Sequence, residues 1–209
     1  MVDSETEFGM IPEGWEVKEI KLFWDVITWK TPSTTKSEYR WADMMFIKTP
    51  DMHWSVYCLQ TSTYLSKIWY LSQKNKTLPK NSILVSCIWT LWVISITSEE
   101  SQFNQQINAI IPNEECYIEY LYLNMKTKKQ QLENLWSNGA TMWNVNKDKF
   151  EKMEIIYPSK NLLTIFHWHV YELFEEILLL QKQNLNLKRQ RNILLPRLMS
   201  GEILVNENM

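Results

Sequence analysis

Histidine and carboxylate side chains are the groups in this sequence best suited to bind a metal ion or to catalyse a reaction. His167 and His169 form an H-x-H pair, and imidazole is a common zinc ligand. The third histidine, His53, has no ligand-like neighbours, and the pair lies near the start of a strongly helical stretch. We therefore expect His167 and His169 to pack at a surface or junction, and we expect no metal site. Glu175 and Glu176 are adjacent on the same stretch and are expected to form a solvated helix face.

Motifs for phosphate binding and catalysis are not evident in the sequence. The chain has 4 glycines in 209 residues, and no segment matches the G-x-x-x-x-G-K-[ST] phosphate-binding loop. The paired acidic motif of a nuclease and the motifs of a methyltransferase do not stand out either. The residues alone give little support for catalysis, and we expect no catalytic residue and no cofactor.

Charge, hydropathy and cysteine content exclude several classes of protein. The chain has 22 Lys and Arg against 24 Asp and Glu, a net charge of -2 and a pI near 6.0, so a nucleic-acid surface would have to be a local patch. No apolar run approaches the roughly 18 to 20 residues of a membrane span, and the acidic N-terminus does not resemble a signal peptide. The three cysteines, Cys58, Cys87 and Cys116, are widely spaced and are expected to be free thiols. We expect a cytoplasmic protein with no membrane partner.

The elements that must position any binding residues fall into a mixed body and a helical tail. Short β-branched or aromatic runs separated by turn signals predict strands in the body, at residues 82–86, 93–97, 109–111 and 153–157. Residues 115–135 have helical periodicity, and Pro158 ends the last strand. We therefore predict an α+β fold with a β-rich domain at 1–158, a long helix at 159–201 and a C-terminal tail at 202–209.

The helical tail carries a heptad seam, in which apolar residues alternate at spacings of 4 and 3. Its positions are Phe166, Val170, Leu173, Ile177, Leu180, Asn184, Leu187, Arg191, Leu194 and Leu198. Leucine dominates one position and β-branched residues begin the other, which is typical of a coiled coil. Asn184 is the type of polar seam residue that fixes register and partner. Pro196 is expected to weaken the last turn and Gly201 to end the helix.

Two interpretations of the seam remain open. The narrow stripe and a length of roughly 50 Å favour a helix that projects and pairs with another helix. The alternative is a helix packed on its own body, with no external partner.

Three stretches of the sequence resemble the specificity (S) subunit of type I restriction-modification systems. The first is the opening I-P-E-G-W-E-V at 11–17. The second is the body pattern, with D-V-I-T at 25–28, T-P-S at 31–33, F-I-K-T at 46–49 and I-I-Y-P at 155–158. The third is the tail, with Q-N-L at 183–185, L-L-P at 194–196 and S-G-E-I at 200–203. Together they cover nearly the whole chain.

This resemblance implies a non-catalytic DNA-recognition domain followed by a spacer helix. The implied partners are double-stranded DNA, a methyltransferase (M) subunit and a restriction (R) subunit, since catalysis belongs to those subunits. In the family two such halves pair through antiparallel helices, so we expect this chain to form a dimer with itself or with a second half-subunit. The alternatives are a coiled-coil adaptor that binds only proteins, or a degraded specificity-subunit fragment without DNA binding.

Basic and amide side chains in body loops are the candidates for DNA contact, because cations hold phosphates and amides or hydroxyls read base edges. The candidates are Lys30, Lys36, Arg40, Lys48, Lys74, Lys76, Asn138 and Thr141. The basic run at 126–129 either faces phosphate or is simply solvated.

The tryptophan and glycine contents are both abnormal. The 4 glycines make up about 2 % of the chain against an average near 7 %, while tryptophan occurs 11 times. Trp29, Trp54 and Trp143 lie in turn-like contexts that favour glycine, and Trp89 and Trp92 replace glycines of the family's strand pattern. We hypothesise that most tryptophan codons are UGA triplets that the source organism reads as glycine. The alternative is a genuinely tryptophan-rich protein.

Overall fold

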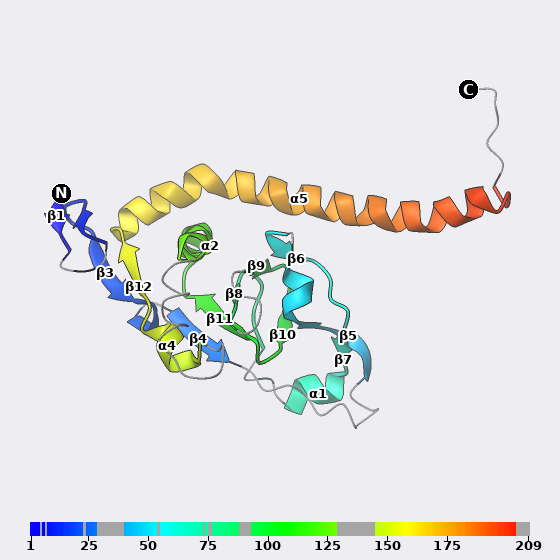
Figure 1. Cartoon of the computed structure of the whole chain (residues 1–209), viewed down its shortest axis with the longest axis horizontal. Helices are drawn as coiled ribbons and strands as arrows, with labels where there is room; N and C mark the ends of the chain where they lie inside the picture. The colour runs from blue at the N-terminus through cyan, green and yellow to red at the C-terminus, as the bar shows by residue number, and fades with distance from the viewer. Residues whose placement is uncertain are drawn as a thin grey trace.

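The chain folds into a layered body covered on one side by a single long helix, as seen in a computed structural model (Figure 1). The structure describes residues 1–4, 6, 8–22, 24–28, 40–53, 55–72, 74, 77–87, 93–128 and 145–203. The predicted α+β class is confirmed.

A five-stranded sheet forms the middle layer of the body. Its order is β4 (Trp24–Thr28), β11 (Ile107–Pro112), β8 (Ile83–Ser86), β9 (Ile94–Thr97) and β6 (Tyr57–Cys58). Neighbouring strands are antiparallel except β6 and β9, which run parallel. Every residue of β8 and β9 is buried, because both faces of the sheet are covered.

Two hydrophobic cores lie on opposite faces of this sheet. Ile83 and Val85 of β8 point into one core, and Leu84 between them points into the other, as the two-residue period of a strand requires. The first core packs against helices. The second packs against a three-stranded sheet with the order β10 (Ser101–Phe103), β5 (Arg40–Ile47) and β7 (Tyr64–Leu65).

Shorter elements complete the body. Two small antiparallel pairs join β1 (Val2–Asp3) to β2 (Met10–Ile11), and β3 (Glu16–Glu19) to β12 (Glu154–Tyr157). The short helices are η1 (Ile20–Leu22), η3 (Thr49–Met52), α1 (Lys67–Ser72), η5 (Glu115–Tyr117), α2 (Ile118–Thr127) and α4 (Lys147–Glu151). Four of the described strands overlap those predicted from sequence, at β8, β9, β11 and β12.

The long helix α5 (Lys160–Met199) contains 40 residues, which corresponds to about 60 Å. It follows Pro158, and the Ser159 hydroxyl caps its first turn by accepting a hydrogen bond from Leu162 N. It ends as the sequence predicts, with Gly201 in the left-handed conformation at φ +72°. Pro196 lies inside the last turns without ending the helix.

The helix rests on the body along its first part and extends beyond the body along its last part (Figure 1). Leu163, Phe174 and Leu178 are buried against the first core, while every residue from 186 to 200 is exposed. Both sequence interpretations therefore describe a part of α5: its beginning packs on its own body, and its end projects. Within the described segments, none of the helices has the length and hydropathy needed to cross a membrane.

Candidate nucleic-acid interface

Two chain segments that carry predicted DNA contacts, 29–39 and 129–144, are each flanked on one side by a residue at one end of the five-stranded sheet. Thr28 ends β4 and lies opposite Asn108 of β11, and Asn108 also lies opposite Val85 of β8. Cys87 follows β8 directly, and Val145 N donates a hydrogen bond to the Cys87 carbonyl at 3.2 Å. Thr28, Cys87 and Val145, which flank segments 29–39, 88–92 and 129–144 on one side each, therefore lie at this sheet end.

The buried amide of Asn108 connects these anchors. Its Nδ2 donates to the Val145 carbonyl at 3.0 Å and lies 3.0 Å from Cys87 Sγ. Asn108 is 4 % exposed, and a buried amide is retained where its hydrogen bonds are satisfied. No local sequence pattern indicates a role for Asn108, because its partners lie 21 and 37 positions away along the chain.

Lys48 lies next to the same sheet end. It follows Ile47, whose carbonyl accepts a hydrogen bond from Asn104 N, and Gln106 in the same turn accepts one from Cys87 N. The Lys48 ammonium donates to the Thr63 hydroxyl at 2.6 Å, and its backbone N–H donates to Asp51. Lys48 is thus partly engaged within the body.

The remaining predicted DNA contacts are not brought together by the described residues. Lys30, Lys36, Lys76, Asn138 and Thr141 lie outside them. Arg40 begins β5, at the opposite end of that strand from Lys48, and the description covers its main chain alone. Lys74 is exposed beyond α1.

The basic run at 126–129 is divided between surface and interior. Lys128 is buried, and its ammonium donates to the Glu154 carbonyl at 2.6 Å and lies 3.8 Å from the centre of the Phe8 ring. For Lys128 both sequence interpretations are wrong, because the side chain is buried and its ammonium binds the Glu154 carbonyl and lies over the Phe8 ring. Lys126 is exposed and lies over the Tyr122 ring, and Lys129 lies outside the described residues.

The seam residues of α5 are divided between the body and the surface. Phe166, Val170 and Ile177 are half-buried, and the last two pack against the first core. The leucines of the other row face away from the body, with exposed fractions of 57 % at Leu173, 48 % at Leu180 and 60 % at Leu187. Asn184, Arg191 and Leu194 are exposed as well.

Polar contacts fix α5 on the body. His167 Nδ1 lies 2.7 Å from Glu119 Oε2 of α2, and that carboxylate is 3 % exposed. Farther along, Gln181 Oε1 accepts a hydrogen bond from Tyr57 N at 3.1 Å. The expected junction role of the first H-x-H histidine is thus visible in this contact, while His169 is exposed.

The side chains suited to metal or nucleophilic chemistry are dispersed. In the part of the chain that the structure describes, no group of three or more His, Cys, Asp or Glu is placed to hold a metal ion. Burial raises the pKa of the Cys58 thiol to about 12, and the nearby Asp51 carboxylate adds to the rise. Burial likewise raises the pKa of Cys87 to about 12, against hydrogen bonding from Asn108. These two thiols are protonated at neutral pH and unsuited to nucleophilic attack.

Most tryptophans that prompted the glycine hypothesis lie outside the described residues. These are Trp29, Trp54, Trp89, Trp92, Trp136 and Trp143. Trp41 and Trp69 lie in β5 and α1, where the description covers their main chains alone. The hypothesis stays a prediction, and codons read directly from the gene test it: UGG at Trp29, Trp89 and Trp92 would refute it.

Similar proteins identify the class to which this arrangement belongs. Residues 12–162 match the family model described as the type I restriction modification DNA specificity domain. The chain is 43 % identical over 195 residues to the type I restriction enzyme HindI specificity subunit of Haemophilus influenzae, covering 92 % of this chain and 42 % of that protein. It is 30 % identical over 160 residues to the MjaIX specificity subunit of Methanocaldococcus jannaschii, covering 75 % and 37 %.

The fold also resembles a solved member of this class. The HsdS subunit from Thermoanaerobacter tengcongensis superposes with a TM-score of 0.58 at 12 % identity, over 92 % of this chain and 46 % of that one. By the family model, residues 12–162 belong to the type I restriction modification DNA specificity domain family. The chain belongs to the specificity-subunit family of type I restriction-modification systems, which confirms the resemblance found in the sequence. It spans about two fifths of the length of the curated relatives it matches.

Proposed function

We propose that this chain is the sequence-recognition component of a type I restriction-modification complex and does not itself catalyse a reaction. The observation that carries the proposal is the match of residues 12–162 to the DNA specificity domain, together with the 43 % identity to a named specificity subunit. In this role the body binds double-stranded DNA and reads one half-site of the target. Methylation and cleavage belong to partner subunits.

The sheet end tied by Asn108 is the proposed base for the DNA-reading segments. Two of the segments anchored there, 29–39 and 129–144, contain Lys30, Lys36, Asn138 and Thr141, the residue types that hold phosphates and read base edges. Because the chain has a net charge of -2, DNA binding by the isolated protein is expected to be weak. Specific binding is expected mainly in the assembled complex, with a strong dependence on salt.

The helix α5 is the proposed scaffold for partners. Its exposed leucines at 173, 180, 187 and 194 form a row that the body does not cover, and such a row is stabilised by a second helix. We propose that α5 pairs with α5 of a second copy, so that two recognition domains sit at the ends of one spacer. The methyltransferase subunit then docks on this paired scaffold, with the restriction subunit as a further partner.

Co-expression with the adjacent type I methyltransferase subunit tests the proposed function. Adenine methylation is mapped on genomic DNA with and without this chain, using the printed sequence and a variant with glycine at Trp29, Trp89 and Trp92. Methylation at one bipartite palindromic sequence that requires the chain is the expected result. If the methyltransferase binds neither form, and methylation is the same without the chain, the recognition role is refuted.

A further inference from the structure

The turn between β10 and β11 connects the two sheets of the body and carries an exposed amide side chain. It consists of Asn104, Gln105 and Gln106, and it leads from the three-stranded sheet into the five-stranded sheet. Asn104 is 8 % exposed and Gln106 is half-buried, whereas Gln105 is exposed. Among the described residues, the Gln105 side chain has no hydrogen-bond partner. Its amide is therefore available to bind another molecule.

Hydrogen bonds on both sides hold this turn in place. Asn104 N donates to the Ile47 carbonyl of β5 at 3.0 Å. Cys87 N, at the end of β8, donates to the Gln106 carbonyl at 2.8 Å. Within the turn, Asn104 Oδ1 accepts a hydrogen bond from Gln106 N at 3.2 Å, and Asn104 Nδ2 donates to Gln106 Oε1 at 2.9 Å. Because the main chain is already ordered, only the side chain of Gln105 loses freedom on binding.

Three polar side chains occupy the same end of three neighbouring strands. The three-stranded sheet has the order β10, β5 and β7, and β5 runs parallel to β10 and antiparallel to β7. Gln105 follows β10, Lys48 follows β5 and Thr63 precedes β7, so all three lie at one end of this sheet. We call Thr63, Lys48 and Gln105 the polar row. Neighbouring strands are about 4.8 Å apart, so the polar row spans roughly 10 Å.

The Asp51 carboxylate joins the loops that carry two members of the polar row. It accepts hydrogen bonds from Lys48 N at 2.9 Å and from Ser62 N at 3.0 Å. It also accepts one from the Thr61 hydroxyl at 2.9 Å. The Lys48 ammonium in turn donates to the Thr63 hydroxyl at 2.6 Å. The polar row therefore combines one cation with one nearby anion, and it would bind a ligand through hydrogen bonds as much as through net charge.

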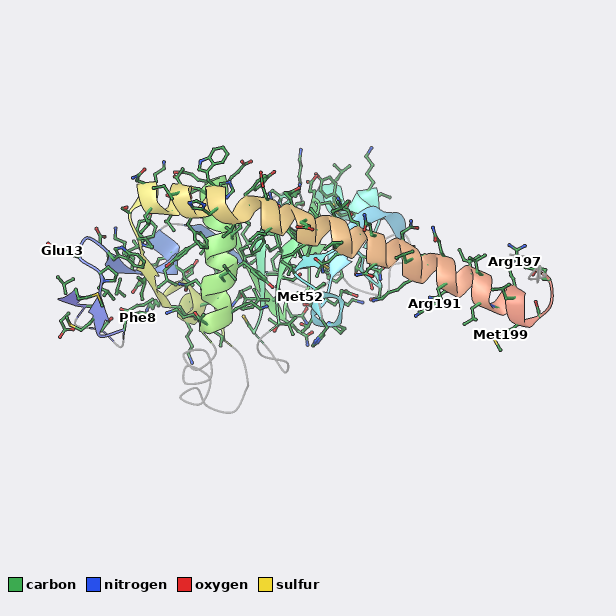
Figure 2. The ribbon with its side chains drawn as sticks, turned by 90° about the horizontal axis from the view of Figure 1, so that it is seen from above. Phe8, Glu13, Met52, Arg191, Arg197 and Met199 are labelled. Atoms are coloured by element: carbon green, nitrogen blue, oxygen red, sulfur yellow. The ribbon has the colours of Figure 1, made fainter. Side chains whose placement is uncertain are left out.

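The polar row lies on the body and not on the projecting end of α5. The helix η3 follows Lys48 directly and ends at Met52. Seen from above, Met52 lies beside α5 within the body, whereas Arg191 and Arg197 lie on the part of α5 that extends beyond it (Figure 2). The polar row is thus separate from the basic end of the helix, and contacts at the row do not depend on how α5 pairs.

The polar row matches the DNA backbone in length and in chemistry. Each strand of a duplex advances about 3.4 Å along the helix axis per phosphate, so roughly 10 Å corresponds to about three phosphates. Amide, ammonium and hydroxyl groups all donate hydrogen bonds to phosphate oxygens. The Lys48 ammonium has three N–H groups, and the one that donates to Thr63 orients the others.

The short turn favours phosphates over base edges as the ligand. The major groove is about 8.5 Å deep, so a residue that reads bases must reach past the backbone. Gln105 lies on a three-residue turn between consecutive strands and meets the outside of a duplex first.

We infer that Gln105 contacts the DNA backbone, and that the polar row is a target-independent phosphate-binding site that fixes where the duplex rests on the body. Phosphate contacts of this kind set the position of a protein on DNA and carry no sequence information. The inference rests on the proposed DNA-recognition function and deepens it by naming a further binding residue and its ligand.

A series of charges at position 105 tests the contact in the complex with the adjacent methyltransferase subunit. Binding is measured at several salt concentrations, on DNA with the methylated sequence and on DNA without it. Gln105→Ala should raise the dissociation constant about tenfold on both DNAs, with the methylated sequence unchanged. Gln105→Lys should steepen the dependence of log Kd on log salt by about 1, because it adds a phosphate-bound cation. Gln105→Glu should bind more weakly than Gln105→Ala, because a carboxylate repels phosphate.

The matched control is Asn113→Ala, because Asn113 is an exposed amide that directly follows β11, at the opposite end of that strand from Gln105. It should change the dissociation constant less than twofold. The lysine and glutamate variants keep the test decisive if the alanine variant folds poorly.

The outcomes separate this inference from the proposed function. An unchanged dissociation constant for Gln105→Ala, or an equal loss for Asn113→Ala, would overturn the backbone contact. A changed methylated sequence for Gln105→Ala would show that the residue reads a base, and it would overturn the target-independent role. In each of these cases sequence-specific methylation by the parent complex leaves the proposed function intact. A parent complex that methylates no defined sequence would refute the proposed function, and this inference with it.

Discussion

The side-chain amide of Asn108 and the backbone carbonyl of Val145 are joined by a hydrogen bond of 3.0 Å at the end of the five-stranded sheet. The bond ties β11 to Val145, the first described residue after segment 129–144. One buried amide thereby fixes the residue that directly follows a segment with predicted DNA contacts.

Replacing Asn108 with leucine should destabilise the body and weaken DNA recognition. The substitution keeps the number and branching of the side-chain heavy atoms and leaves the buried Val145 carbonyl without its donor, which costs about 1–3 kcal/mol of unfolding free energy. Urea unfolding measures this loss. Asn186→Ala, on the exposed part of α5, serves as control and should leave the midpoint unchanged. An equally stable Asn108→Leu protein would show that the amide does not hold the segment.

Removing Lys30 and Lys36 together should reduce the salt dependence of DNA binding. Each phosphate contact that is lost lowers the slope of log K against log salt by about 1. Binding of the assembled complex to its target is measured between low and moderate salt. Lys160→Ala removes a cation that pairs with Glu114 at 2.8 Å and is the matched control. If the slope is the same in the double variant and the parent, these lysines do not touch phosphate.

The position of α5 was predictable from sequence, but the division of its faces was not. Pro158, Ser159 and Gly201 mark its ends by their backbone chemistry, and the predicted helix agrees with the described one. The heptad spacing did not reveal that Val170 and Ile177 pack on the body. The body-facing stripe through Phe174 and the exposed row lie next to each other, and both are apolar. Periodicity alone does not say which one is covered.

The proposed DNA-reading site was predictable only as residue types. Composition and turn signals indicate which loops carry basic and amide side chains, and the family resemblance indicates what those side chains bind. Which described residues lie together at the edges of these segments depends on sheet order, in which β11 lies between β4 and β8. Contacts such as Asn108 with Cys87 join residues far apart in sequence, so no local pattern predicts them.

The contact between His167 and Glu119 should account for a large part of the attachment of α5 to α2. Replacing His167 with alanine removes a 2.7 Å partner from a carboxylate that is 3 % exposed. Hydrogen bonds to buried charged groups contribute roughly 1.5–3 kcal/mol, and a loss of that size is expected in denaturant unfolding. His169→Ala changes an exposed histidine two residues away and should cost less than about 0.5 kcal/mol. Similar losses in the two variants would contradict the assignment.

The three cysteines should differ sharply in reactivity. Because burial raises the pKa of Cys58 and Cys87 to about 12, only about one thiol in 10⁴ is ionised at pH 8. Burial also raises the pKa of Cys116, but that residue is only half-buried. At pH 8 a maleimide should label Cys116 slowly and the other two only after unfolding. Burial holds the Cys58 and Cys87 thiols neutral in the folded protein, whereas the same thiols ionise in the unfolded chain above about pH 9. The free energy of unfolding should therefore fall as the pH rises from about 9 toward 12. Rapid labelling of all three in the native protein would contradict this.

Exchanging the charges of Arg191 and Glu176 tests the proposed orientation of α5 most directly. If the proposed pairing of α5 is antiparallel and centred on residue 182, Arg191 lies beside Leu173 of the second copy, about one turn from Glu176 of that copy. The contact occurs twice by symmetry, so Arg191→Glu or Glu176→Arg alone should weaken the dimer at least tenfold, or about 1.4 kcal/mol. The double variant should recover to within about threefold of the parent in sedimentation equilibrium. In a parallel pair, residue 191 faces residue 191 and residue 176 faces residue 176, so the double exchange would restore nothing, and the absence of recovery would exclude the antiparallel arrangement.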